Sequence, residues 1–294
     1  MITERAPAKV NLVLHVGPRR ADGLHELCSL FASLELADRV EVEPLAEGRE
    51  DRIRCPGVEG PNLAAAALAT YREVRPSDGP PALEVRIDKR VPVAGGLGGG
   101  SADAAAVLRA ADALASDPLG PERLRELGMR LGADVPSQVW PRHAVVTGTG
   151  EHVEPVELPG ADLVLVPQRV GLATADVYAE ADRRGDVRAR LDPEALRALA
   201  ASGSLEELLP ALENDLEPAA RALRPELAAI ADKLRARGAR AALLSGSGPT
   251  LVGLFASPGA ARAAAEAIEG ATLTRLRATP LDASPGGATA EGAR

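Results

Sequence analysis

A glycine-rich stretch at residues 92–101 constrains this chain more than any other feature. It contains five glycines and lies between two patterned segments. Residues 83–88 alternate apolar and polar side chains, which predicts a strand, and the segment from Ser101 to about Leu114 has the periodicity of a helix. Glycine lets a ligand approach the backbone closely, and the first turn of a helix offers free N–H groups and the positive end of its dipole. The stretch therefore predicts a phosphate-binding loop rather than a flexible linker.

Two familiar phosphate-binding motifs do not match this stretch. A Walker A loop needs a Lys followed by Ser or Thr after its last glycine, and here Gly100 is followed by Ser101 and Ala102. In a Rossmann fingerprint that uses Gly96 and Gly98, a third glycine would stand where the chain has Ser101. No second parallel βαβ unit is evident in the sequence. The stretch is thus a phosphate loop of another kind.

The composition is that of a globular protein, since 46% of the 294 residues are hydrophobic and 26% are charged. This length corresponds to one large domain or two small ones. The formal net charge of −8 disfavours a nucleic-acid partner, because such proteins usually carry a basic face. An acidic protein that binds an anionic ligand must gather positive charge locally or use backbone dipoles.

Other features bear on where the protein works and on metal binding. No run of about 18 uncharged apolar residues is present, so we expect no membrane span. The N-terminal residues Met1 to Pro7 lack the apolar run of a signal peptide, and we expect a cytoplasmic protein. Two cysteines, Cys28 and Cys55, are too few for a disulfide framework or a zinc site, and we predict no metal-ligating residues.

Strand and helix patterns are mixed along the chain, which predicts the α+β class. The expected strands span residues 8–16, 34–44, 83–88, 144–150, 163–167, 241–244, 250–255 and 273–278. The expected helices span residues 62–72, 101–114, 121–131, 175–183, 193–200, 205–212, 225–237 and 258–268. A break near residues 155–160 divides the chain into an N-terminal domain, 1–157, and a C-terminal domain, 158–279. The tail, 280–294, is rich in Ala, Gly, Ser and Pro and is expected to be disordered.

Lysine is rare in this chain: among 34 Lys and Arg residues, only Lys9, Lys89 and Lys233 are lysines. A chain that uses Arg almost everywhere is expected to keep Lys where a compact point charge is needed. Lys9 and Asn11 are two residues apart in an expected strand, so their side chains share one face. Lys9 is therefore a candidate catalytic residue, and a solvent-facing lysine on an edge strand is the alternative.

Six ordered motifs resemble those of the GHMP small-molecule kinases. The glycine-rich stretch resembles their phosphate loop, residues 8–14 resemble their N-terminal strand motif, and residues 245–250 resemble their C-terminal glycine motif. Three further segments resemble signatures of one branch, the 4-diphosphocytidyl-2-C-methyl-D-erythritol kinases; they span residues 20–31, 131–136 and 214–217. The resemblance implies a two-domain GHMP-kinase fold, with an N-terminal ribosomal-protein-S5-like nucleotide-binding domain and a C-terminal ferredoxin-like α/β domain.

The resemblance implies an ATP site built from the loop and the segments that border it. In the related enzymes a Lys at the position of Lys89, and an Asn-Leu pair, border the adenine pocket. The expected ATP-binding residues are Asn62, Leu63, Lys89, Pro92, Val93, Ala94, Gly95, Gly96, Leu97, Gly98, Gly99, Gly100, Ser101 and Ala102. For Lys89, a solvated strand end is the alternative.

Asp134 is the expected catalytic aspartate by the same resemblance, either as the base or as the group that orients the acceptor hydroxyl. Its local pattern, just before Val135 and Pro136, also fits an Asx turn. A lysine near Asp134 would keep that carboxylate ionised and would lower the cost of charge at the transferring phosphoryl group. This is the role that we expect for Lys9.

On the substrate side, the resemblance implies a set of residues spread along the chain. They are Asn11, Asp22, His25, Asp134, Thr174 and Tyr178. His25 is expected to read the cytosine edge by hydrogen bonds, and a loop histidine without such a role is the alternative. The related enzymes usually have a Tyr that stacks on the cytosine where this chain has Leu24. Leu24 offers only apolar contact, so we expect Tyr178 to carry more of the stacking.

The resulting prediction is a kinase of the non-mevalonate route to isoprenoid precursors. It would transfer the γ-phosphoryl group of ATP to the 2-hydroxyl of 4-diphosphocytidyl-2-C-methyl-D-erythritol, with Mg²⁺ held mostly by ATP oxygens and water. The expected partner is this cytidine-diphosphate-linked polyol, with no nucleic acid and no membrane, and the protein would be a monomer or a homodimer. Two alternatives are another GHMP kinase, acting on homoserine or mevalonate, and a ligand-binding protein that keeps the fold without the reaction.

Overall fold

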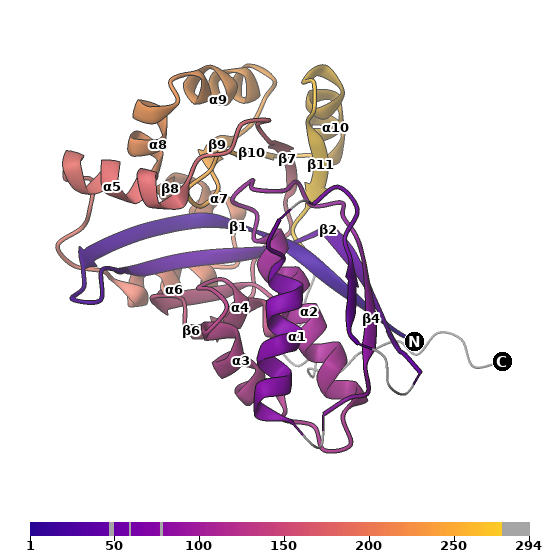
Figure 1. Cartoon of the computed structure of the whole chain (residues 1–294). Helices are drawn as coiled ribbons and strands as arrows, with labels where there is room; N and C mark the ends of the chain where they lie inside the picture. Colours follow the sequence, from indigo (N-terminus) through magenta and orange to yellow (C-terminus); the bar gives the residue numbers. More distant parts are fainter. Residues whose placement is uncertain (47–49, 59, 77–78, 278–294) are drawn as a thin grey trace.

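The computed structural model describes residues 1–46, 50–58, 60–76 and 79–277. Within these ranges the chain forms two sheets with helices packed on them (Figure 1). The tail that we expect to be disordered, 280–294, lies outside the described residues. Among the described residues, no helix is long and apolar enough to cross a membrane.

The larger sheet is built around one long hairpin. Its strands are β1 (Ile2–Arg19), β2 (His25–Pro44), β3 (Arg52–Arg54), β4 (Leu83–Asp88), β5 (Ala144–Gly148), β6 (His152–Pro155) and β8 (Glu213–Asn214). They lie in the order β3-β4-β2-β1-β8, and β5 pairs with both β2 and β6. The antiparallel pairing of β1 with β2 shifts register between Pro7 and Lys9 and again between Asn11 and Val13. Such irregularities re-aim side chains locally, and here they flank Lys9 and Asn11.

The smaller sheet belongs to the C-terminal half. Its strands are β7 (Asp162–Val166), β9 (Ala241–Leu244), β10 (Leu251–Phe255) and β11 (Thr272–Arg275). They are all antiparallel and lie in the order β11-β7-β10-β9.

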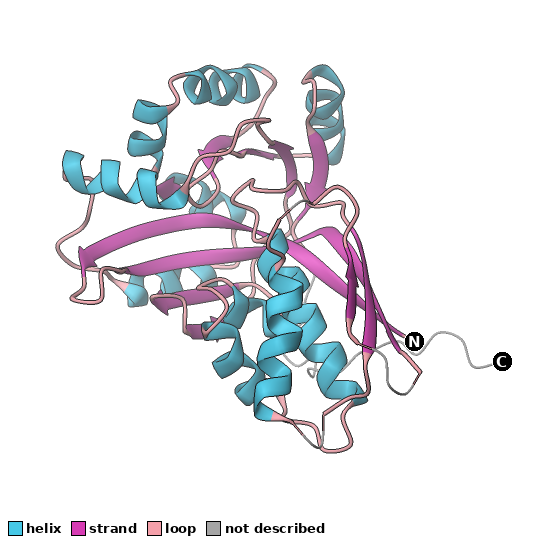
Figure 2. Ribbon diagram, in the orientation of Figure 1, coloured by secondary structure: helices cyan, strands magenta, loops and turns pink. Residues whose placement is uncertain are grey.

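Helices cover both sheets. They are α1 (Leu63–Val74), α2 (Gly99–Leu114), α3 (Pro121–Met129), α4 (Val135–Val139), α5 (Thr174–Arg184), α6 (Pro193–Ala201), α7 (Leu205–Leu208), α8 (Glu217–Leu223), α9 (Glu226–Ala236) and α10 (Pro258–Ala267). Figure 2 shows the β1–β2 hairpin running through the middle of the molecule, with the smaller sheet and its helices on one side and the N-terminal helices on the other.

Two hydrophobic clusters hold the parts together. In the first, α1 and α2 pack on β2 and β4, and the nearly continuous alanine run at 102–106 lets α2 approach closely. In the second, Leu12 and Leu30 of the hairpin meet Leu163 and Leu254 of the smaller sheet. The second cluster joins the two halves of the chain, so residues from both halves can meet at one site. The predicted domain boundary at 157/158 remains a prediction.

The structure agrees with the α+β prediction and corrects several element bounds. The predicted strand 83–88 and the strand 241–244 match β4 and β9. His25 begins β2 and is therefore a strand residue rather than a loop residue, because the hairpin continues almost to its tip; its substrate role stays a prediction. The short elements β3, β6, β8, α4 and α8 have no counterpart in the sequence prediction, since so few residues show no periodicity.

Candidate active site

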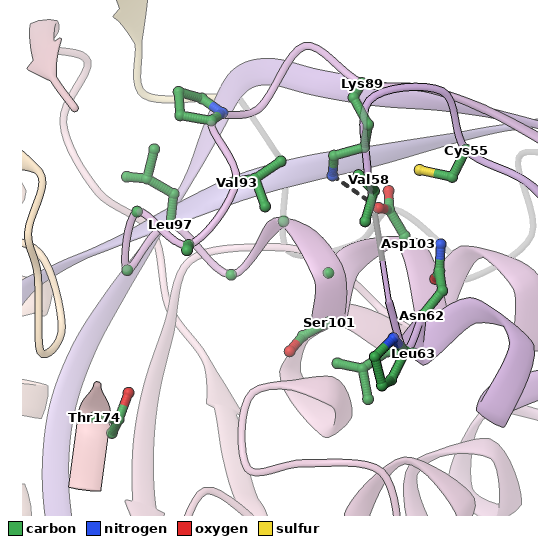
Figure 3. Close-up of a pocket in the computed structure, with 18 residues that line it drawn as sticks. Cys55, Val58, Asn62, Leu63, Lys89, Val93, Leu97, Ser101, Asp103 and Thr174 are labelled. Atoms are coloured by element: carbon green, nitrogen blue, oxygen red, sulfur yellow. Dashed lines mark hydrogen bonds and ion pairs between the residues drawn. The ribbon is translucent and has the colours of Figure 1, made fainter. Parts of the chain in front are cut away.

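A cavity of about 460 Å³ lies between the glycine-rich loop and the start of α1 (Figure 3). All but one of the predicted ATP-binding residues line it. The remaining lining residues are Cys55, Val58, Pro61, Asp103 and Thr174. Asn62 also accepts a hydrogen bond from the backbone N–H of Ala64 and thereby caps the N-terminus of α1. The cavity thus joins three segments that are separated in the sequence.

Ala102 is the exception. Its side chain is buried in the cluster under α2, and its backbone N–H donates to the Gly98 carbonyl. It comes one helical position after Ser101, and this step turns it from the cavity to the core. Ala102 therefore offers no group to a ligand in this cavity.

The loop is held in place by close packing on two other parts of the chain. A Cβ at Gly96 would lie 2.3 Å from the Ser245 carbonyl oxygen, and a Cβ at Gly98 would lie 2.9 Å from Cγ of Lys9. Both glycines have a positive φ, of 73° and 68°. Gly98 is also the N-cap of α2, and no side chain caps this helix. The N–H groups of its first turn therefore remain for an anionic ligand.

Lys89 is held by two buried carboxylates at the edge of the cavity. Its Nζ donates to Asp38, and it lies 2.8 Å from Oδ2 of Asp103 (Figure 3). The Lys89 side chain is only 12% exposed, so the alternative of a solvated strand end is wrong. Burial alone would lower the pKa of Lys89, but the charges and hydrogen bonds of Asp103 and Asp38 raise it.

The two carboxylates differ in how well they are satisfied. Asp38 also accepts hydrogen bonds from the backbone N–H groups of Arg90 and Val91. In Asp103, Oδ1 is buried without a hydrogen-bond partner among the described residues. Burial raises the pKa of Asp103 to about 7, although Lys89 acts in the opposite direction.

Lys9 and Asp134 meet beside the loop. Nζ of Lys9 lies 3.3 Å from Oδ2 of Asp134 and donates to Oδ1 of Asn11 at 2.9 Å. The amide of Asn11 in turn donates to the Ser29 hydroxyl, which donates to the Val13 carbonyl. This chain of hydrogen bonds fixes the ammonium group, so the predicted substrate residue Asn11 orients Lys9.

The two members of this ion pair differ in exposure. The Lys9 side chain is 5% exposed, which overturns the alternative of a solvent-facing lysine, and that of Asp134 is 32% exposed. Asp134 occupies the N-cap position of α4, but its side chain makes no capping hydrogen bond. The Asx-turn alternative is therefore not what the structure shows. The carboxylate is open on one side to a ligand.

A second glycine turn, Ser245–Thr250, closes the site from the C-terminal half. The Ser245 hydroxyl donates to the Gly96 carbonyl. The amide of Asn214 donates to the carbonyls of Leu244 and Gly246, at 2.8 Å each. A Cβ at Gly246 would lie 3.8 Å from Nζ of Lys9. The hydrogen bonds of Asn214 thus fix the second turn, and the Ser245 hydroxyl joins this turn to the glycine-rich loop.

The remaining predicted substrate residues fall into three places. His25 and Tyr178 form a ring pair with centroids 5.3 Å apart. Burial, and then the charge of Asp134, raises the pKa of Tyr178 to about 12. Thr174 lines the nucleotide-side cavity and shares a hydrogen bond with the Ser247 hydroxyl. Asp22 stays at the exposed hairpin tip, where it accepts from the Leu24 N–H, and no contact joins it to the other site residues.

Three carboxylates near these residues have no place in the sequence prediction. They are Asp38, Asp103 and Asp182. Asp103 follows the loop by two residues, a position from which a helix can return a side chain to the cavity, so its spacing is a usable signal. Asp38 and Asp182 carry no such signal, because only strand pairing and packing bring them to Lys89 and His25.

Comparisons with known proteins agree with this geometry. The family model for the GHMP kinases N terminal domain matches residues 62–141, and the model for the GHMP kinases C terminal region matches residues 194–273. A Kineococcus radiotolerans protein named 4-diphosphocytidyl-2-C-methyl-D-erythritol kinase is 46% identical over 275 residues, which cover 89% of this chain and 83% of that protein. A relative of the same name from Anaeromyxobacter dehalogenans is 44% identical over 278 residues, 90% of this chain and 84% of the relative.

Solved structures separate family from fold. The crystal structure of a 4-(cytidine 5'-diphospho)-2C-methyl-D-erythritol kinase has a TM-score of 0.81 and 38% sequence identity, and the match covers 95% of this chain and 100% of that one. A homoserine kinase from Cytophaga hutchinsonii has a TM-score of 0.67 at 20% identity, covering 94% of each chain, and shares the fold alone. From the family models, the identities and the coverage together, we conclude that this chain belongs to the GHMP kinases and, within them, to the 4-diphosphocytidyl-2-C-methyl-D-erythritol kinase family.

Proposed function

We propose that the protein transfers the γ-phosphoryl group of ATP to the 2-hydroxyl of 4-diphosphocytidyl-2-C-methyl-D-erythritol. The observation that carries the proposal is the ion pair of Lys9 and Asp134 beside the glycine-rich loop, in a chain whose relatives are named for this reaction. A kinase must hold the phosphates, align the acceptor hydroxyl and manage its proton. The described residues offer a group for each task.

The nucleotide would occupy the cavity between the loop and α1. The open N–H groups at the start of α2, together with the Ser101 hydroxyl, would bind the phosphate oxygens. Asn62 and Leu63 line the same cavity and would border the base. Lys89 would act here mainly through Asp38 and Asp103, since both already hold its ammonium group. The loop thus provides binding that needs little net positive charge, which suits an acidic protein.

The acceptor would bind against Asp134. Its carboxylate is the exposed member of the ion pair, so it can accept the proton of the attacking hydroxyl. The oxygen of that hydroxyl forms the new bond to the γ-phosphorus, and ADP leaves. Lys9 keeps positive charge between the carboxylate and the loop, because its stem packs on Gly98. Asn11 holds this ammonium group in place.

The cytidine end would lie against His25 and Tyr178. Tyr178 supplies an aromatic face next to the His25 ring. Leu24 at the hairpin tip is 54% exposed and would add apolar contact. The proposed substrate would therefore extend from the hairpin tip to Asp134.

Mg²⁺ would be held mainly by the nucleotide. Among the described residues, no group of three or more His, Cys, Asp or Glu side chains could hold a metal ion. The oxygen donors that line the cavity on α2 are the Ser101 hydroxyl and the Asp103 carboxylate. When bound, the ion supplies charge neutralisation for the phosphates. Every other task described above falls to residues of this chain.

Turnover of a panel of acceptors tests the proposal. The purified protein is incubated with ATP and Mg²⁺ and with the cytidine-linked substrate, homoserine or mevalonate in turn, and ADP formation is measured. We expect turnover with the cytidine-linked substrate at least about 10²-fold above that with either competitor, because a site built for a polar group rejects an acceptor that lacks it. Equal turnover with homoserine or mevalonate would overturn the assignment, and no turnover with any acceptor would favour a binding protein.

A further inference from the structure

His25 is oriented by two contacts, and only one of them is internal to the hairpin. Its Nδ1 donates to the Gly17 carbonyl at 2.9 Å, which fixes the ring. Its Nε2 therefore points away from the hairpin and lies 3.3 Å from Oδ2 of Asp182 on α5. The His25 side chain is 5% exposed, whereas that of Asp182 is 34% exposed. Of the two partners, the Asp182 carboxylate is thus the one that solvent can reach.

Asp182 shares a helix face with the residue expected to stack on the base. Tyr178 and Asp182 are four residues apart on α5, so their side chains are neighbours. The Tyr178 ring contacts the His25 ring, and Asp182 contacts its Nε2. A ligand bound beside His25 would therefore meet both the aromatic ring of Tyr178 and the carboxylate of Asp182.

The charge of Asp182 is not neutralised by an arginine or lysine among the described residues. Two neighbouring carboxylates differ in this respect: Glu180 of the same helix pairs with Arg183, and Asp186, just beyond its end, pairs with Arg184. A carboxylate oxygen accepts hydrogen bonds and cannot donate them. Asp182 therefore keeps free acceptor capacity at a half-exposed position.

We propose that Asp182 is a specificity residue that accepts a hydrogen bond from the exocyclic amino group of the substrate base. Cytosine carries an amino donor at the position where uracil carries a carbonyl acceptor. The Asp182 carboxylate attracts the first and repels the second. Leu24 at the hairpin tip has no polar group and cannot distinguish cytosine from uracil by a hydrogen bond. The Asp182 carboxylate would make this distinction. The inference rests on the proposed function, because it names how the cytidine end is chosen.

The test compares the cytidine-linked substrate with its uridine-linked counterpart. Wild type and the variants Asp182→Asn and Asp182→Ala are assayed for kcat and KM with each substrate. We expect the wild-type preference for cytidine, measured by kcat/KM, to fall at least about tenfold in Asp182→Asn, because the amide can also donate to the uracil carbonyl. The loss should appear in KM for the cytidine-linked substrate, with kcat at saturation nearly unchanged. Asp182→Ala should also lose on the cytidine-linked substrate, and its gain on the uridine-linked substrate should be smaller than that of Asp182→Asn, because it removes the repulsion without adding a donor.

Asp176→Asn serves as the matched control. It removes the same charge from the first turn of the same helix, and Asp176 makes no side-chain hydrogen bond or ion pair with the described residues. Its preference should equal that of wild type. An unchanged cytidine preference in Asp182→Asn overturns the proposal, and so does an equal loss on both substrates, which would mean that Asp182 only orients His25. A wild type that does not use the cytidine-linked substrate would instead overturn the proposed function.

Discussion

Two lysines are buried against the glycine-rich loop, and their carboxylate partners differ. Lys89 lies between Asp38 and Asp103, whose side chains are 0% and 4% exposed. Lys9 pairs with Asp134, which is 32% exposed. The loop contacts both lysines, since Cβ atoms built at Gly98 and Gly99 would meet Lys9 and Lys89 respectively. The same residue type thus occurs in a closed cluster and in an open one.

This difference indicates what each cluster can do. In the closed cluster the three charged groups are already bound to one another, although Lys89 and Asp103 line the nucleotide-side cavity. Their contacts hold the segment after β4 to β2 and α2. A buried pair of this kind is weak evidence for stability, but breaking it leaves an uncompensated charge. In the open cluster the lysine is fixed while the aspartate remains reachable. A fixed cation beside an accessible carboxylate is suited to chemistry.

The largest expected effect comes from breaking the closed cluster. Lys89→Met leaves Asp38 and Asp103 buried side by side without their cation, so we expect the free energy of unfolding to fall by about 3–5 kcal/mol. Urea denaturation of wild type and Lys89→Met measures this difference in the free energy of unfolding. Lys233→Met is the control, because Lys233 is exposed on α9, and it should change stability by less than about 0.5 kcal/mol. A Lys89→Met protein as stable as wild type would mean that the closed cluster has no structural role.

The open cluster should respond in turnover rather than in stability. Lys9→Ala and Asp134→Ala should each lower kcat at least about 10²-fold, because each removes a group that acts in the transition state. Nucleotide binding, measured by calorimetry, should remain. The double variant should lose little beyond either single one, since the two residues act as a unit. Near-normal turnover in both single variants would remove Lys9 and Asp134 from the mechanism.

The smallest expected effect sharpens the view of Asp103. Its folded-state pKa of about 7 lies above its ordinary value, so the folded state binds this proton more tightly than the unfolded state does. The carboxyl therefore contributes its full stability at low pH and loses it as the pH rises through 7. Asp103→Asn cannot titrate, so the stability of this variant relative to wild type should increase between pH 4 and pH 7, and then stay constant. Unfolding curves measured across this range test it, and a constant difference would contradict the buried, titrating Asp103.

The sequence was a good guide where the site is local. The strand at 83–88, the loop and the helix after it are adjacent in the chain, and nearly all of the predicted nucleotide residues line one cavity. Ala102 is the one predicted nucleotide residue that does not line this cavity, because the resemblance names a position and not the direction of its side chain. The contact between Lys9 and Asp134 could be expected only from the family motifs. The local sequence pattern around either residue contains nothing that points to the other.

The sequence by itself determined the α+β class, the phosphate loop and the family, because these depend on local periodicity, on glycine chemistry and on ordered motifs. Only the tertiary structure decided which charged side chains are buried in ion pairs and which remain accessible to a ligand. Asp38 reaches Lys89 through the pairing of β2 with β4, and Asp182 reaches His25 because α5 packs beside the hairpin. Exposure and charge pairing arise from contacts between distant segments, and no single segment of sequence contains them.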